Sequence, residues 1–170
     1  MTKSKKILFG IFVLLVVAWV VFRWYDFFTG PRVEQPLEYS HKIHTEMLKC
    51  EECHIGVVNS ASATIPDIKV CMGCHKDEPL SNNPEEKKLL NYIKSNKNIP
   101  WKRLYRTPVH VYFSHNRHVV VGKLACEKCH GNMGKTSKPP GKALVSLDMG
   151  DCIACHEKNN VDTSCVICHR

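Results

Sequence analysis

The sequence predicts a mostly irregular chain with short α-helices and little or no β-sheet, preceded by one long apolar helix at the amino terminus. Three observations predict this fold class. All ten cysteines of the 170-residue chain fall within five copies of one motif, Cys-x-x-Cys-His. Sixteen consecutive residues, 7–22, carry no charge. The remaining residues, 29–170, leave about 28 for each motif, which is too few for a normal apolar core if each motif holds a large ligand.

The repeated motif is the attachment signature of c-type haem. Its two thiols add to the haem vinyl groups, and its histidine then lies on the proximal side of the iron. The sequence therefore predicts five covalently bound haems c, with the short helices packed around them. The attachment cysteines are Cys50 and Cys53, Cys71 and Cys74, Cys126 and Cys129, Cys152 and Cys155, and Cys165 and Cys168. The proximal histidines are His54, His75, His130, His156 and His169.

Zinc and disulfides are the two structural alternatives for so many cysteines. Zinc sites combine two Cys-x-x-Cys pairs, or mix in spaced histidines, and five pairs is an odd number for that arrangement. A tetrahedral Cys₄ site also has no need of an adjacent histidine. A disulfide framework would not repeat one local spacing five times. The pattern favours haem over both.

The histidine count predicts how the irons are ligated. Five further histidines remain, one for each haem, and four of them form two Ser-His-x-x-His pairs ahead of a haem motif: His41, His44, His110, His115 and His118. We expect these to be distal ligands of five bis-histidine haems. Some could instead be surface or propionate-binding histidines, and His110 lies outside the pairs. Without His110, one iron would be five-coordinate or would take a methionine, which raises the potential: Met47, Met72, Met133 or Met149.

Residues 1–28 are predicted to be a basic start followed by a transmembrane anchor. Lysines precede the uncharged stretch, and Arg23 and four aromatic residues follow it. A cleaved signal peptide would have small residues at that point. The stretch is short for a span, but Lys6 and Arg23 can snorkel and the aromatic rings can lie at headgroup level. The lysines place the amino terminus in the cytoplasm, which puts the haem part in the periplasm, where c-type haem is attached. We therefore expect a single-pass protein of the cytoplasmic (inner) membrane.

The rest of the chain divides into a linker and three segments. The linker, 29–38, contains Gly30, Pro31 and Pro36. A dihaem module, 39–80, and a trihaem module, 109–170, share an aromatic-Ser-His-x-x-His pattern offset by 74 residues, which indicates an internal duplication. Between them lies a spacer, 81–108. Asn83 as cap, Pro84, two early glutamates and an apolar stripe predict a helix over about 84–96.

The net charge of +8 raises the question of nucleic acid as a partner. We exclude it, because the propionates of the haems cancel most of the excess and no aromatic-plus-arginine pattern for stacking bases is present. With so little protein for each haem, the porphyrins must supply much of the buried apolar surface. We therefore expect the chain without haem not to fold.

The paired histidines and repeated Cys-x-x-Cys-His motifs resemble those of class III, or cytochrome c7-like, multihaem cytochromes c. The resemblance implies that His41 and His115 ligate the next haem of their own module, and that His44 and His118 ligate later haems. Three further stretches are similar to the pentahaem subunit of alternative complex III and the multihaem subunit of the menaquinone reductase complex: 101–105, 108–115 and 146–150. Those subunits pass electrons among quinone-reactive membrane subunits, iron–sulfur subunits and periplasmic cytochromes. This chain is compact with one short anchor, which leaves open whether it belongs to such a complex.

We therefore expect an electron carrier with no catalytic site of its own, working between a quinone-reactive membrane partner and periplasmic cytochromes or reductases. One alternative is a quinol dehydrogenase that oxidises menaquinol directly, with Asp26 or Glu34 as the nearest candidate proton acceptors. A second is a structural haem subunit of a larger respiratory complex. A third is the reduction of a small oxyanion at one high-spin haem.

Overall fold

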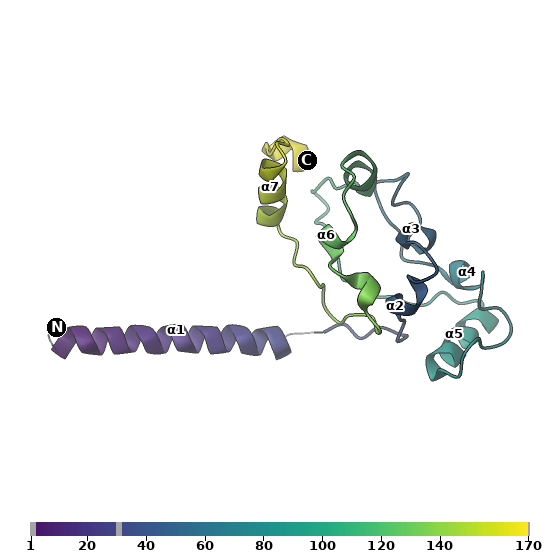
Figure 1. The fold of residues 1–170 in the computed structure, drawn as a ribbon, viewed down its shortest axis with the longest axis horizontal. Coiled ribbons are helices and arrows are strands. Elements are labelled where there is room, and N and C mark those ends of the chain that lie inside the picture. Colours follow the sequence, from purple (N-terminus) through teal and green to yellow (C-terminus); the bar gives the residue numbers. More distant parts are fainter. Residues whose placement is uncertain (1–2, 30–31, 170) are drawn as a thin grey trace. The chain divides into compact units, whose positions relative to one another are not determined.

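The computed structural model describes residues 3–29 and 32–169, and the chain divides into two units, Met1–Arg32 and Val33–Arg170. The first unit contains α1 (Lys3–Thr29), which Figure 1 shows as one uninterrupted helix. Within it, 22 residues from Ser4 to Tyr25 are long and apolar enough to cross a membrane. A signal sequence would share this length and composition. Gly30 and Pro31 of the expected linker, and the side chains of Asp26, Phe27 and Phe28, lie outside the described residues.

The second unit consists of short helices joined by long connections (Figure 1). Within residues 32–169 there is no strand, and a single antiparallel bridge joins Val111 to His169. The expected fold class, mostly irregular with short helices and little or no sheet, is confirmed. The helical elements are α2 (His41–His44), α3 (Cys50–Cys53), α4 (Ile68–Cys71), α5 (Pro84–Lys94), the π-helix η1 (Arg117–Val121), α6 (Glu127–His130), the 3₁₀-helix η2 (Met133–Lys135), α7 (Met149–Lys158) and α8 (Cys165–Cys168).

Helix α5 forms where the sequence predicts it. The Asn83 side chain accepts a hydrogen bond from the Glu85 N–H at 3.0 Å, and Pro84 occupies the first turn, where its missing N–H is not needed. The helix ends at Lys94, two residues before the expected end, and the Ser95 hydroxyl donates to the Asn91 carbonyl at 2.7 Å. The bonds at both ends fix the bounds of α5, and therefore which face of the helix carries its apolar residues.

The apolar core is small and lies where α4, α5 and the segment before α2 meet. Tyr92 and Trp101 pack against it from its edge. No large side chain in the described part of the chain is fully buried. A conventional domain of this length buries far more apolar surface, so this core alone is a weak source of stability. Its buried members are Leu37, Ile68, Leu90, Ile93 and Ile99.

Candidate haem-binding sites

Each Cys-x-x-Cys-His motif is wound into about one helical turn. In four of the motifs the N–H of the histidine donates to the carbonyl of the first cysteine at 2.9 Å, and in the remaining motif the histidine, His156, lies inside α7. One turn brings the two thiols and the imidazole close together, as attachment of one porphyrin requires. All ten cysteines are free thiols, either exposed or half-buried. The backbone thus presents five similar three-residue clusters.

The two Ser-His-x-x-His segments have the same local structure. In each, the second histidine bonds through Nδ1 to the serine carbonyl at 2.8 Å: His44 to Ser40, and His118 to Ser114. Tyr39 stacks on His44 with ring centroids 4.4 Å apart, and Phe113 stacks on His118 at 4.6 Å. The same aromatic rings meet His41 and His115 edge-on, at 4.9 and 4.7 Å. These matching contacts favour duplication over convergence.

Four of the five further histidines face the histidine of a different motif. Ring centroids lie 6.3 Å apart for His44 and His75, 6.3 Å for His115 and His130, 6.2 Å for His118 and His156, and 5.4 Å for His110 and His169. The fifth histidine, His41, lies near His54. Burial, together with the nearby His54 and His44, lowers the pKa of His41 to about 4.

These separations fit an iron atom between two imidazoles. With a metal–nitrogen bond of about 2 Å and about 1.1 Å from the ring nitrogen to the centroid, two opposed rings lie about 6.2 Å apart. Three pairs match this value and the pair at 5.4 Å is somewhat closer. Seven of the ten rings have an Nδ1 partner, which leaves Nε2 to bind a metal. These are His41, His44, His54, His75, His115, His118 and His156.

The two modules hold one another's histidines. Thr136, which follows α6, accepts from His41 Nδ1 at 3.2 Å, and its own carbonyl accepts the Lys42 N–H at 3.0 Å. Conversely, Ala61, which follows α3, accepts the His115 backbone N–H through its carbonyl at 2.9 Å. The same carbonyl oxygen lies 3.2 Å from His115 Nδ1, and the Ala63 N–H lies 3.3 Å from that nitrogen. The segment after one haem motif therefore orients the histidine that precedes another.

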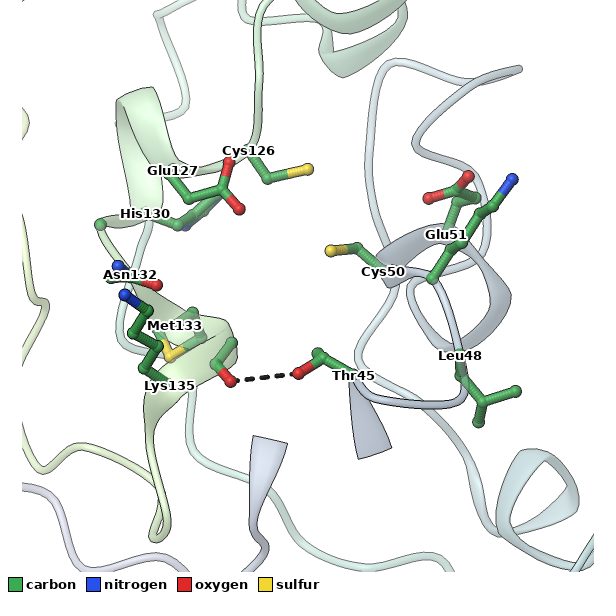
Figure 2. Close-up of a pocket in the computed structure, with 13 residues that line it drawn as sticks. Thr45, Leu48, Cys50, Glu51, Cys126, Glu127, His130, Asn132, Met133 and Lys135 are labelled. Carbon is green, nitrogen blue, oxygen red and sulfur yellow. Dashed lines mark hydrogen bonds between the residues drawn. The ribbon is translucent and has the colours of Figure 1, made fainter. Parts of the chain in front are cut away.

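A cavity of about 510 Å³ lies at this junction, between α3 on one side and α6 with η2 on the other. Figure 2 shows the sulfur atoms of Cys50 and Cys126 directed toward one another across it, with His130 and Met133 on the wall that carries α6. Burial, together with the neighbouring Cys50 thiol, raises the pKa of the Cys126 thiol to about 11. The volume is within the range of cofactor pockets.

Comparison with known proteins identifies the family of this chain. Residues 37–89 and 111–170 match the model of cytochrome c7 and related cytochrome c. The chain belongs to this family. It is a multihaem cytochrome c that functions in electron transfer. This cytochrome is also 30% identical over 187 residues to the menaquinone reductase multiheme cytochrome c subunit of Nitratidesulfovibrio vulgaris (strain Hildenborough), over 94% of this chain and 88% of that protein.

The His75 imidazole of this cytochrome has a different kind of partner from the rest. Its Nδ1 bonds to Glu86 Oε1 at 2.8 Å. Burial alone would raise the pKa of the Glu86 carboxyl, but hydrogen bonds from Ser81, Leu80 and His75 outweigh it and lower the pKa to about 2. The sequence identifies Glu86 only as an acidic residue at a helix start, because nothing in the local pattern predicts that it contacts a histidine eleven residues earlier in the chain.

Sequence reasoning also missed Thr136 and Ala61, whose roles depend on the docking of the two modules. The methionines considered as ligands occupy varied positions. Met72 packs at the edge of the core and Met133 lines the cavity, whereas Met47 and Met149 are exposed. His110, the histidine outside the Ser-His-x-x-His pairs, stacks on His169.

Proposed function

We propose that this cytochrome carries five haems c, each ligated by two histidines. Numbering the motifs 1–5 along the chain, the ligand pairs are His54 with His41, His75 with His44, His130 with His115, His156 with His118, and His169 with His110. The ring separations of 6.2–6.3 Å in three of these pairs are the observation that carries the proposal. The haems supply one-electron chemistry when bound, and the chain fixes the imidazoles that set their potentials.

We further propose that the motifs are ordered in space as 2, 1, 3, 4, 5. After burial itself, Cys53 of motif 1 raises the pKa of the Cys71 thiol of motif 2. Cys50 of motif 1 faces Cys126 of motif 3 (Figure 2).

The same reasoning orders the remaining motifs. Burial raises the pKa of Cys129 of motif 3, and Cys155 of motif 4 raises it further. Burial likewise raises the pKa of Cys152 of motif 4, to which Asp151, Cys129 and then Cys168 of motif 5 contribute. Each motif therefore has near neighbours on both sides except at the two ends, as a linear path for electrons requires.

Helix α1 is proposed to be an uncleaved anchor, with the amino terminus in the cytoplasm and the haem part in the periplasm. Its 22-residue apolar span and the flanking charges support this. By its likeness to the menaquinone reductase subunit, this cytochrome is proposed to work with quinone-reactive membrane subunits and iron–sulfur subunits, or with periplasmic cytochromes. In this proposal it has no catalytic site of its own and binds no nucleic acid.

The experiment that tests this function is purification of the native protein in a gentle detergent. Co-purifying multi-span and iron–sulfur subunits, an intact mass that includes residue 1 and five haems, and exclusively low-spin spectra are expected. Reduced menaquinol should reduce the haems only when those subunits are present. Reduction of the isolated protein by the quinol would instead favour direct oxidation, and fewer than five haems would contradict the cofactor assignment.

A further inference from the structure

We propose that Glu86 is a positioning residue that lowers the reduction potential of the haem attached at Cys71 and Cys74, by accepting a hydrogen bond from His75. The inference rests on the proposed function, in which His75 binds that iron. The bond joins His75 Nδ1 to Glu86 Oε1 at 2.8 Å. With Nε2 on the iron, Nδ1 carries the proton, so the imidazole donates and the carboxylate accepts.

The Glu86 carboxylate is held in one orientation. It is 8% exposed, in the first turn of α5. Besides the imidazole, Oε1 accepts from the Leu80 N–H at 2.7 Å, and Oε2 accepts from the Ser81 N–H at 2.8 Å and the Ser81 hydroxyl at 2.6 Å. Each contact supplies a donor and none supplies an acceptor, so the group is bound as an anion.

The Nδ1 acceptors of the other ligand histidines that have one are neutral. His54 bonds to the carbonyl of Thr64 at 2.9 Å, His156 to that of Asp162 at 3.3 Å, and His41 to a threonine hydroxyl. Among the residues that the structure describes, His75 alone has a carboxylate as its Nδ1 partner. Any effect of this carboxylate should therefore be confined to one of the five haems.

A carboxylate partner changes the electronic character of an imidazole ligand. Sharing of the Nδ1 proton with an anion makes Nε2 more basic, and a more basic ligand stabilises ferric over ferrous iron. A buried negative charge near the iron acts in the same direction, because it is poorly screened. Both effects lower the reduction potential of this haem. Motif 2 lies at one end of the proposed order, so Glu86 lowers the potential of a terminal haem of the path.

The test is Glu86→Gln in the complete holoprotein, followed by spectroelectrochemical titration. Glutamine keeps the size and one acceptor oxygen but removes the charge. We expect one of the five haems to become easier to reduce by about tenfold in its equilibrium constant, which is about 59 mV for a one-electron couple. The other four potentials should change much less, and mass spectrometry should still find five haems.

Two further variants separate this effect from charge or folding. Glu85→Gln removes the same charge one residue earlier, from a carboxylate that bonds to Lys88 at 2.6 Å and not to a histidine, so the potentials should stay close to those of the wild type. Ser81→Ala removes one donor from Glu86 and leaves more of its charge for His75, so the same haem should become harder to reduce. This opposite sign remains decisive if Glu86→Gln fails to fold.

The inference is overturned if no single haem shifts in Glu86→Gln or Ser81→Ala, or if Glu85→Gln gives the same shift. Failure of the proposed ligation would look different. His75→Ala would then leave every haem low-spin, whatever the potentials of the Glu86 variants. The two hypotheses therefore fail on separate measurements, one electrochemical and the other spectroscopic.

Discussion

The imidazole rings of His115 and His130 lie 6.3 Å apart with an interplanar angle of 7°, although His115 precedes η1 and His130 ends α6. The carbonyl of Ala61 fixes His115 from the first module. Tyr105 meets His130 edge-on with centroids 4.6 Å apart and planes at 83°. The third haem motif could not hold the two rings in this arrangement by itself, because each ring is supported by a residue distant in sequence.

Replacement of His115 by alanine should leave five haems attached but convert one iron to a high-spin state, because attachment needs only the motif whereas low-spin iron needs both imidazoles. Optical and electron paramagnetic resonance spectra of the oxidised protein measure this. Asn116→Ala, a change at the next residue that removes no ring, is the matched control and should remain low-spin. An unchanged spectrum in the His115 variant would refute the assignment of this ligand pair.

Thr136→Val should raise the potential of the haem at motif 1 and cost about 1 kcal/mol of stability, because His41 loses the acceptor for its Nδ1 proton. The lost contact is the one at 3.2 Å, together with the bond from the Thr136 hydroxyl to the Met133 carbonyl. Thermal melts and redox titration of the holoprotein measure the two effects.

Thr45→Val is the control for that variant. The Thr45 hydroxyl bonds to the carbonyl of Gly134 at 3.1 Å, so it joins the same two segments without touching a histidine ring (Figure 2). The stability of the Thr45→Val variant should fall by a similar amount, while the haem reduction potentials stay constant. Equal redox shifts in both variants would show that only the docking of the segments matters.

Gly56→Ala should destabilise the segment that orients His115. Gly56 has φ +96°, and an added Cβ would lie 2.6 Å from the Ser62 carbonyl oxygen. A left-handed conformation costs an L-residue about 1–2 kcal/mol, and the clash adds to this. Gly150→Ala, in the first turn of α7, should cost less, because its Cβ would meet only the Asp148 side-chain oxygen, at 3.1 Å, and alanine favours a helix. Similar melting temperatures for the two variants would contradict this reading of the turn.

What could be predicted from the sequence is what local chemistry determines. The haem motifs form single turns because their spacing is self-contained, and α5 begins at Asn83 because a cap and a proline specify its start. The Ser-His-x-x-His segments likewise carry their aromatic partner, one residue before the serine. Each of these signals lies within about ten residues, so no knowledge of the folded chain is needed to find it.

The remaining features depend on segments that meet only after folding. Glu86 lies eleven residues after His75, with a turn between them, and its role as a partner cannot be separated from its role in starting a helix. Thr136 contacts His41 across 95 residues, and Ala61 contacts His115 across 54. The π-helix Arg117–Val121 also has no signature of its own in the sequence.

Glu85 makes a pH-dependent contribution to stability. A hydrogen bond from Lys88 and one from the Glu38 N–H lower the pKa of its carboxyl from the ordinary 4.5, and the more distant Lys138 acts in the same direction. When the folded-state pKa of a carboxyl is lowered, its ionised form stabilises the fold. This stabilisation is fully present above the unfolded-state pKa and is lost as the pH falls through the folded-state pKa. The wild type should therefore melt slightly higher than Glu85→Gln near neutral pH, and this difference in melting temperature should vanish in acid. A difference that grows below pH 4.5 would contradict this.

Removal of the haems should abolish folding of the second unit. Its apolar core in the described residues is limited to a few side chains around α4 and α5, and most other large apolar residues are half-buried or exposed. Such a core does not offset the entropy of ordering the chain, so porphyrin burial must supply the difference. Protein made without haem-attachment machinery should give no cooperative melt in circular dichroism.

A partial removal distinguishes this dependence from a general effect of mutation. Cys165→Ser combined with Cys168→Ser removes only the haem at α8, which contacts the rest of the unit through the bridge to Val111 and few other bonds. That variant should keep four haems and a cooperative melt at a reduced temperature.

The same pair of changes at Cys126 and Cys129 removes the haem at the junction of the modules, where the histidines of both are held. It should melt far lower. A cooperative melt of the haem-free chain would show that the protein part folds by itself, against this account of its stability.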